Sequence, residues 1–233
     1  MKRILVISML LWNIFASHAQ QPDWANKTRY EAANERLQHV SDSLRVVMMG
    51  NSITEYWEEL HPEFFTAHGL VGRGISGQVS SQMLSRFRQD VINLHPRVVV
   101  INCGTNDIAE NNGPYDEDIT MDNIMSMTEL AQTHGIDVIL SSVLPTDSFI
   151  WNPHVKNVSA KVVQLNRRIM GYCEANNIPY LDYYSSMVGS RGTAMDAGYT
   201  DDGVHPNSTG YDVMEVKLLD MLDQLSNINY NNQ

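Results

Sequence analysis

The segment 50–54 (Gly-Asn-Ser-Ile-Thr) places a serine where nucleophilic chemistry is possible. It follows an apolar run that predicts a strand, so Ser52 is expected at a strand-to-helix turn, with its hydroxyl exposed and its backbone N–H near a helix start. An ordinary helix N-cap serine is the structural alternative. Because Thr54 stands at the last position, the segment departs from Gly-x-Ser-x-Gly, which disfavours an α/β-hydrolase nucleophile elbow.

A carboxylate and an imidazole lie three residues apart near the carboxyl end, in the segment 201–206 (Asp-Asp-Gly-Val-His-Pro). Asp202 could curl back to accept the Nδ1–H of His205, which would orient the ring and stabilise it when protonated. The Nε2 of His205 would then be free to take the Ser52 proton and return it to a leaving alcohol. A polar turn before a helix is the alternative interpretation.

Two further loops contain groups that could donate hydrogen bonds to an oxyanion. Gly77, in the segment 72–77, could present a backbone N–H with no side chain in the way, and Asn106, in the segment 103–107, could add a side-chain amide. Glycines also make turns and Asn-Asp pairs also cap helices, so both loops have structural explanations. The glycine loop lacks the Gly-Lys-Ser/Thr of a phosphate-binding P-loop.

Predicted strands and helices alternate along the chain, and these elements must position the candidate groups. Short runs rich in apolar and β-branched residues predict five strands, at 44–49, 70–74, 98–102, 137–143 and 178–181. Apolar residues at helical spacing predict helices at 83–94, 119–131 and 158–173, and a last helix at 208–222. Such alternation predicts an α/β domain with a doubly wound parallel sheet covered on both faces.

Loops that follow the strands of such a sheet meet at its carboxyl edge, where ligands bind. The serine, the glycine loop and Asn106 all follow predicted strands, and the Asp202/His205 pair precedes the last helix. The polar connection 182–204 is predicted to be a loop that leads into this pair. The four segments are therefore expected to meet at one site.

Taken together, the four segments resemble the motif blocks of SGNH hydrolases, also called GDSL-like lipases and esterases, over residues 44–210. The resemblance implies a three-layer α/β/α sandwich with a flavodoxin-like, five-stranded parallel sheet. It also implies acyl-ester substrates and neither a metal nor an organic cofactor. The family's naming motif has Asp and Leu where this chain has Asn51 and Ile53, and neither change removes a catalytic group.

The resemblance also implies a role for each candidate residue. Ser52 would be the nucleophile, His205 the base and Asp202 the carboxylate that orients it. The backbone N–H of Ser52 would form the oxyanion hole with Gly77 and Asn106. Gly74 is a rival for the glycine position, although the Ile-Ser-Gly context favours Gly77.

Several aromatic, histidine and cysteine positions are open to more than one interpretation. Trp57 and Trp151 are expected near the catalytic edge, where either ring could stack on a sugar, and core or rim packing is the alternative. Cys103 and Cys173 could form a disulfide or be small buried apolar residues. Five other histidines show no metal-ligand spacing and are interpreted as surface or loop residues: His61, His68, His95, His134 and His154.

The N-terminal residues indicate where the protein is located, and the net charge limits the classes of partner that it can bind. A basic start, an apolar run at 4–16 and small residues at 17 and 19 are typical of a signal peptide over residues 1–19. This predicts a single domain at 20–233, exported to the periplasm or secreted. The apolar run is shorter than the roughly 20 residues of a spanning helix, so no stable membrane anchor is expected. A net charge of −11 disfavours nucleic acid and anionic membranes as partners.

The leading hypothesis is hydrolysis of a short acyl ester, such as an acetyl ester, of a carbohydrate or small molecule through a covalent acyl-enzyme. A lysophospholipase or thioesterase-type acylhydrolase is the alternative within the enzyme class. A non-catalytic glycan-binding module of the same fold is a second alternative. A transferase, in which an alcohol intercepts the acyl-enzyme, is a third. The pattern does not distinguish between oligomeric states.

Overall fold

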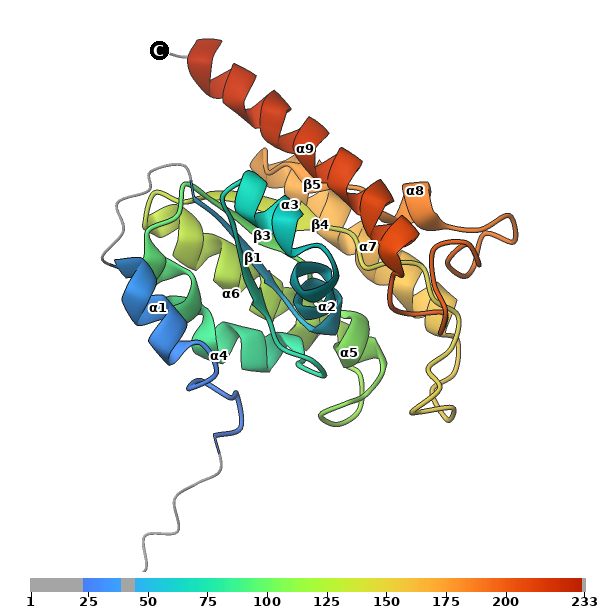
Figure 1. The fold of residues 1–233 in the computed structure, drawn as a ribbon. Coiled ribbons are helices and arrows are strands. Elements are labelled where there is room, and N and C mark those ends of the chain that lie inside the picture. The colour runs from blue at the N-terminus through green and yellow to red at the C-terminus, as the bar shows by residue number, and fades with distance from the viewer. Residues whose placement is uncertain (1–22, 39–44, 232–233) are drawn as a thin grey trace, which may run out of the picture.

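The computed structural model describes residues 23–38 and 45–231. The predicted signal peptide, residues 1–19, lies outside the described residues. Five parallel strands form one sheet in the order β2-β1-β3-β4-β5, and helices cover both of its faces (Figure 1). The predicted three-layer α/β/α sandwich with a flavodoxin-like strand order is confirmed.

The strands follow the apolar runs of the sequence. They are β1 (Val46–Gly50), β2 (Leu70–Gly74), β3 (Val98–Ile101), β4 (Asp137–Ser141) and β5 (Tyr180–Leu181). Every residue of β1 and β3 is buried, because these central strands are covered on both faces and need no polar side. The edge strand β5 is shorter than the expected 178–181.

The helices fill the connections between the strands. They are α1 (Glu31–Gln38), α2 (Ser52–Leu60), α3 (Pro62–Ala67), α4 (Ser80–Asp90), the 3₁₀ turn η1 (Ile92–Leu94), α5 (Thr105–Ile108), α6 (Glu117–Thr133), α7 (Val158–Asn176), α8 (Tyr184–Met187) and α9 (Ser208–Asn231). Helix α8 interrupts the segment predicted as a loop at 182–204. Just before this helix, the Asp182 carboxylate accepts the backbone N–H of Ser185 at 3.0 Å. In the described part of the chain, no helix is long and apolar enough to cross a membrane.

Alternating side chains of each strand supply two separate cores. Val47 and Met49 of β1 pack with α4, α6 and α7 on one face, whereas Val46 and Met48 pack with α2, α3 and α9 on the other. Figure 1 shows α9 as the long red helix lying across this second face. Since α2 starts at Ser52 and α9 starts three residues after His205, packing on the same face brings distant parts of the chain together.

Candidate active site

Ser52 is the first residue of α2 and follows the end of β1. Asn51 caps this helix, because its Oδ1 accepts the backbone N–H of Ile53 at 3.1 Å. The N-cap alternative for Ser52 is therefore wrong, and its hydroxyl is available for other contacts. The Ser52 Oγ lies 2.8 Å from Nε2 of His205. Asn51 performs the capping that an aspartate would perform at this position.

His205 lies in a closed turn that precedes α9. Its Nδ1 is 2.7 Å from Oδ2 of Asp202, and Oδ1 of Asp202 accepts the backbone N–H groups of Val204 and His205. The Thr200 hydroxyl closes the turn by donating to the carbonyl of His205 at 2.7 Å. An ionised carboxylate only accepts hydrogen bonds, so Nδ1 carries a proton, and in the neutral ring the Nε2 lone pair then faces Ser52.

The hydrogen bonds around Asp202 favour its ionised form. Partial burial alone would raise the pKa of this carboxyl, but bonds from the His205 ring and from the backbone N–H groups of His205 and Val204 outweigh it. The pKa of Asp202 is lowered as a result. The carboxylate is therefore charged at neutral pH, which is the state that accepts the hydrogen bond of the His205 ring.

Gly74 and Gly77 differ in what surrounds them. A Cβ at Gly74 would lie 2.3 Å from the backbone nitrogen of Glu55 and 2.6 Å from the carbonyl of Asn51, so close packing against α2 requires glycine there. Gly77 has a φ of +77°, and a Cβ there would meet only the Asn111 amide at 4.0 Å. Gly74 is thus a packing glycine, whereas Gly77 is needed for its backbone conformation and has open space beside it.

Asn106 is a buried residue of α5 that contacts the Gly77 loop. Its Nδ2 donates to the carbonyl of Gln78 at 2.9 Å, and its Oδ1 accepts from Nδ2 of Asn111 at 2.9 Å. A primary amide has two N–H groups, so one remains for a ligand. The next residue, Asp107, joins α5 to α4 by accepting the Ser80 backbone N–H at 3.0 Å, and burial raises the pKa of its carboxyl.

The four predicted segments converge at the carboxyl edge of the sheet. The strand order reverses between β1 and β3, and Ser52 and Asn106 follow those two strands. This is the topological switch point at which doubly wound sheets bind ligands. The Gly77 loop is held to the same place because the backbone N–H of Ile75 donates to the carbonyl of Gly50 at 3.3 Å.

Trp57 lies in the core, so of the two interpretations left open by the sequence the structure supports core packing and contradicts stacking on a sugar. Its side chain is buried, stacked on Tyr211 at 5.6 Å between ring centroids, and its Nε1 donates to Glu215 at 3.2 Å. The reason is helical spacing, because Ile53 and Trp57 share the face of α2 that packs on the sheet.

Trp151 and Tyr56 both lie beside the imidazole of His205. The ring centroid of Trp151 is 6.1 Å from that of His205, and the centroid of Tyr56 is 5.2 Å away. Both side chains are exposed. Nε1 of Trp151 also donates to Asn111, which in turn donates to Asn106. Sequence reasoning missed Tyr56, although its position four residues after Ser52 on a helix places both on one side of α2.

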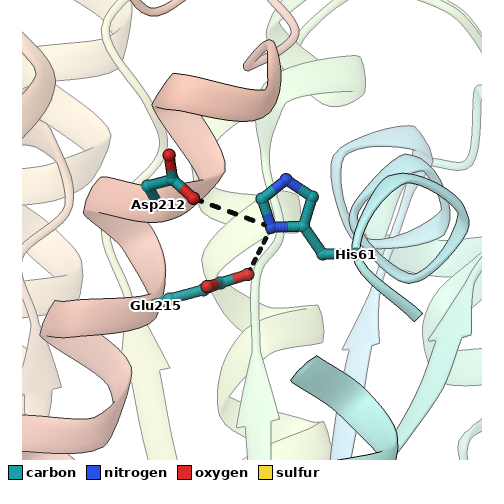
Figure 2. Close-up of side chains that lie close together, drawn as sticks. All are labelled: His61, Asp212 and Glu215. Carbon is teal, nitrogen blue, oxygen red and sulfur yellow. Dashed lines mark hydrogen bonds and ion pairs between the residues drawn. The ribbon is translucent and has the colours of Figure 1, made fainter. Parts of the chain in front are cut away.

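His61 connects the end of α2 to α9, so it is not a simple surface or loop histidine. Figure 2 shows it between α2 and α3, facing Asp212 and Glu215 of α9. Its Nδ1 is 2.6 Å from Glu215 and 4.0 Å from Asp212, and its Nε2 is 2.8 Å from the Ser208 hydroxyl. The three ligand atoms of His61, Asp212 and Glu215 lie within 4.8 Å of one another, a spacing that could hold a metal ion. The contacts also link the end of α2 to α9 directly, which no short-range sequence pattern could reveal.

Both cysteines are free and buried. Of the two interpretations left open by the sequence, the structure supports small buried apolar residues over a disulfide. Burial raises the pKa of both thiols, that of Cys173 to about 12, so neither is an activated nucleophile.

A family model agrees with this arrangement. Residues 48–213 match the model of the GDSL-like Lipase/Acylhydrolase family, which covers both the Ser52 segment and the His205 turn. This chain belongs to the GDSL-like lipase/acylhydrolase family. Membership places it among the carboxylic ester hydrolases.

Solved structures and a curated relative are also similar to this GDSL-like chain. A GDSL-like lipase from Bacteroides thetaiotaomicron is 51% identical, with a TM-score of 0.84 over 86% of this chain and 98% of that one. A Bacteroides fragilis protein assigned as an acylhydrolase is also 51% identical, with a TM-score of 0.83 over 87% and 98% of the two chains. An acetylxylan esterase from Xylanibacter ruminicola is 22% identical over 204 residues, which span 72% of this chain but only 41% of that relative.

Proposed function

We propose that the protein hydrolyses short acyl esters with Ser52 as the nucleophile. The observation that carries the proposal is the continuous hydrogen-bonded chain from Ser52 Oγ to His205 Nε2 at 2.8 Å and from His205 Nδ1 to Asp202 at 2.7 Å. Groups in this order perform acyl transfer on unrelated folds.

The reaction runs in two halves. His205 Nε2 takes the hydroxyl proton as Ser52 Oγ attacks the ester carbonyl, and it gives that proton to the departing alcohol when the C–O bond breaks. Water then attacks the acyl-enzyme and transfers a proton to His205, which returns it to Ser52 as the acid leaves. Asp202 remains a carboxylate throughout and stabilises the imidazolium formed in each half.

The carbonyl oxygen becomes an anion in both halves and needs donors. The proposed donors are the backbone N–H groups of Ser52 and Gly77 and the free N–H of the Asn106 side chain. The position of Ser52 at the start of α2 supports this role, because backbone N–H groups are unpaired at a helix N-terminus. The positive φ of Gly77 and the burial of Asn106 support the other two.

The proposed substrate is a short acyl ester, such as acetyl, of a carbohydrate. Two observations favour a sugar: the acetylxylan esterase is a relative, and the exposed rings of Trp151 and Tyr56 lie beside His205, where sugar rings can stack. A lysophospholipase or thioesterase activity is the alternative, since the family description includes lipases. We also propose that residues 1–19 direct export to the periplasm or secretion of a single domain, residues 20–233.

The test is hydrolysis of acetyl, butyryl and octanoyl p-nitrophenyl esters by the wild type and Ser52→Ala. Ser226→Ala is a matched control, because its hydroxyl donates only to a carbonyl of α9. We expect loss of about 10⁴-fold or more in kcat for Ser52→Ala, no change for Ser226→Ala, and the highest rate on the acetyl ester. Equal rates in wild type and Ser52→Ala would refute the mechanism. A preference for octanoyl esters would favour the lipid-directed alternative, and sugar binding without acid release from any ester would favour a binding module.

A further inference from the structure

The N-terminal segment, residues 23–38, lies against the loop that carries Gly77. The Tyr30 hydroxyl donates to the carbonyl of Gly74, where this loop begins. The Gln78 side chain, where the loop ends, donates to the carbonyl of Ala25 at 2.7 Å. The segment therefore holds both ends of the loop 74–78, although it lies outside the residues 48–213 that match the family model.

A third connection reaches the middle of the loop through α2. Arg29 donates to one carboxylate oxygen of Glu55 at 2.8 Å. The other oxygen of Glu55 accepts the backbone N–H and the hydroxyl of Ser76 at 2.7 and 2.6 Å. Three residues of the N-terminal segment thus contact or support consecutive parts of one short loop.

Several directional polar bonds attach the N-terminal segment. The buried residue of α1 is Asn34, a polar side chain where an apolar one is usual. Its Oδ1 accepts from Nε of Arg73 at 2.9 Å, and its Nδ2 donates to Asp90 at 2.6 Å. The guanidinium of Arg73 also lies 4.6 Å from the centre of the Tyr30 ring. Apolar packing would tolerate small shifts, whereas these bonds fix the segment in one register.

The bonds of Gln78 extend this support to the rest of the site. Its side-chain oxygen accepts from Nε of Arg86 at 2.6 Å, and Arg86 also donates to the carbonyl of Gly50, two residues before Ser52, at 2.9 Å. The backbone carbonyl of Gln78 accepts from the Asn106 amide. A displacement of Gln78 would therefore move the donors proposed for the oxyanion.

We propose that the N-terminal segment is a positioning element of the oxyanion hole, with Tyr30 in the segment and Gln78 in the loop as the positioning residues. The inference rests on the proposed function, because it assumes that the loop donates the Gly77 N–H. Neither residue touches the substrate. They act by holding a loop with a left-handed glycine in the one conformation that aims this N–H, so that no reorganisation is needed during the reaction.

The experiment compares Tyr30→Phe with Tyr184→Phe in the full-length protein. Both tyrosines donate a hydroxyl to a glycine carbonyl, Tyr184 to Gly192 at 3.2 Å away from the loop 74–78. The measurements are kcat and KM for p-nitrophenyl acetate, thermal stability, and inhibition by a trifluoromethyl ketone, whose adduct with serine carries an oxyanion. Gln78→Glu is the second variant, since it keeps an acceptor for Arg86 but loses the donor to Ala25.

We expect Tyr30→Phe to lower kcat about tenfold, less than the 10²–10³ of losing an oxyanion donor outright, with KM within about twofold. Inhibition by the ketone should weaken by a similar factor. Gln78→Glu should behave in the same way, and Tyr184→Phe should keep wild-type kcat at a comparable loss of thermal stability.

Wild-type kcat and ketone inhibition in both Tyr30→Phe and Gln78→Glu would overturn the inference. So would a loss of kcat in Tyr184→Phe equal to that in Tyr30→Phe, because the effect would then follow stability alone. Ser52→Ala, measured beside them, separates the two proposals: if it remains active the proposed function fails, whatever the positioning variants do.

Discussion

His205 Nδ1 lies 2.7 Å from one oxygen of Asp202, while the other oxygen accepts the backbone N–H groups of Val204 and His205. The two oxygens therefore have separate tasks: one holds the turn and the other sets the ring tautomer. Asp202→Asn should keep the first task, because the amide oxygen can still accept the backbone groups.

Asp202→Asn should lose the second task. The amide N–H would face Nδ1 and force the ring proton onto Nε2, which could then no longer accept the Ser52 proton. We expect a fall in kcat of about 10²–10⁴-fold at neutral pH, with little change in thermal stability. The exposed neighbour in Asp201→Asn is the control for loss of charge, and equal losses of kcat in both variants would contradict the assignment.

Thermal stability should depend on pH through Asp202. Its pKa is lowered in the folded protein, so the ionised form stabilises the fold above about pH 3.9, the ordinary value in an unfolded chain. This contribution should disappear as the pH falls through the lowered pKa. Melting curves between pH 7 and 3 should show a smaller acid-induced drop for Asp202→Asn than for the wild type, and parallel drops would contradict the prediction.

Gly74→Ala and Gly77→Ala should separate stability from catalysis. A methyl group at Gly74 would overlap the backbone of α2, so we expect a loss of about 3 kcal/mol in the free energy of unfolding. At Gly77 the space is open but φ is +77°, so alanine should cost about 1–2 kcal/mol and turn the backbone N–H away.

Urea unfolding and kcat measured on the same samples would test this pair. We expect the larger loss of stability in Gly74→Ala. We expect the larger loss of kcat per folded molecule in Gly77→Ala. A Gly77→Ala protein with full kcat would remove Gly77 from the oxyanion hole.

Substitution of Trp57 should affect stability, whereas substitution of Trp151 should affect substrate binding. Trp57→Ala removes a buried ring of the second core and should lower the free energy of unfolding by about 3–5 kcal/mol. Trp151→Ala, at an exposed position, should change it by less than about 0.5 kcal/mol but raise KM for an acetylated oligosaccharide.

Trp151→Phe is the control, since it keeps a ring and loses the N–H bonded to Asn111. If KM for the oligosaccharide rises equally in Trp151→Phe and Trp151→Ala, the hydrogen bond and not stacking is responsible. An unchanged KM in both variants would remove Trp151 from the sugar site.

The parts of the fold that depend on local pattern were predictable. The apolar runs of β1 and β3 indicated strands of a parallel sheet covered on both faces, and the motif segments after them were correctly placed at one sheet edge. The sequence left core packing and sugar stacking both open for Trp57, although Ile53 and Trp57 stand one helical turn apart on α2, a spacing that indicates a buried face.

Contacts between distant segments that carry no recognisable motif were not predictable. His61 meets Glu215 across 154 positions, and Tyr30 meets Gly74 across 44. Helix α1 gave no periodic signal, because its buried residue is Asn34 and its bonds are polar. Such contacts depend on where separate elements pack, and no spacing within one element encodes them.

The separation of Ser52 and His205 also governs when the enzyme becomes competent. The two residues stand 153 positions apart, and the His205 turn adjoins the last helix of the described chain. A nascent polypeptide on the ribosome thus contains Ser52, the proposed nucleophile, long before it contains His205, the proposed base. Until the final turn is synthesised and docked, the proposed esterase lacks its base and is inactive.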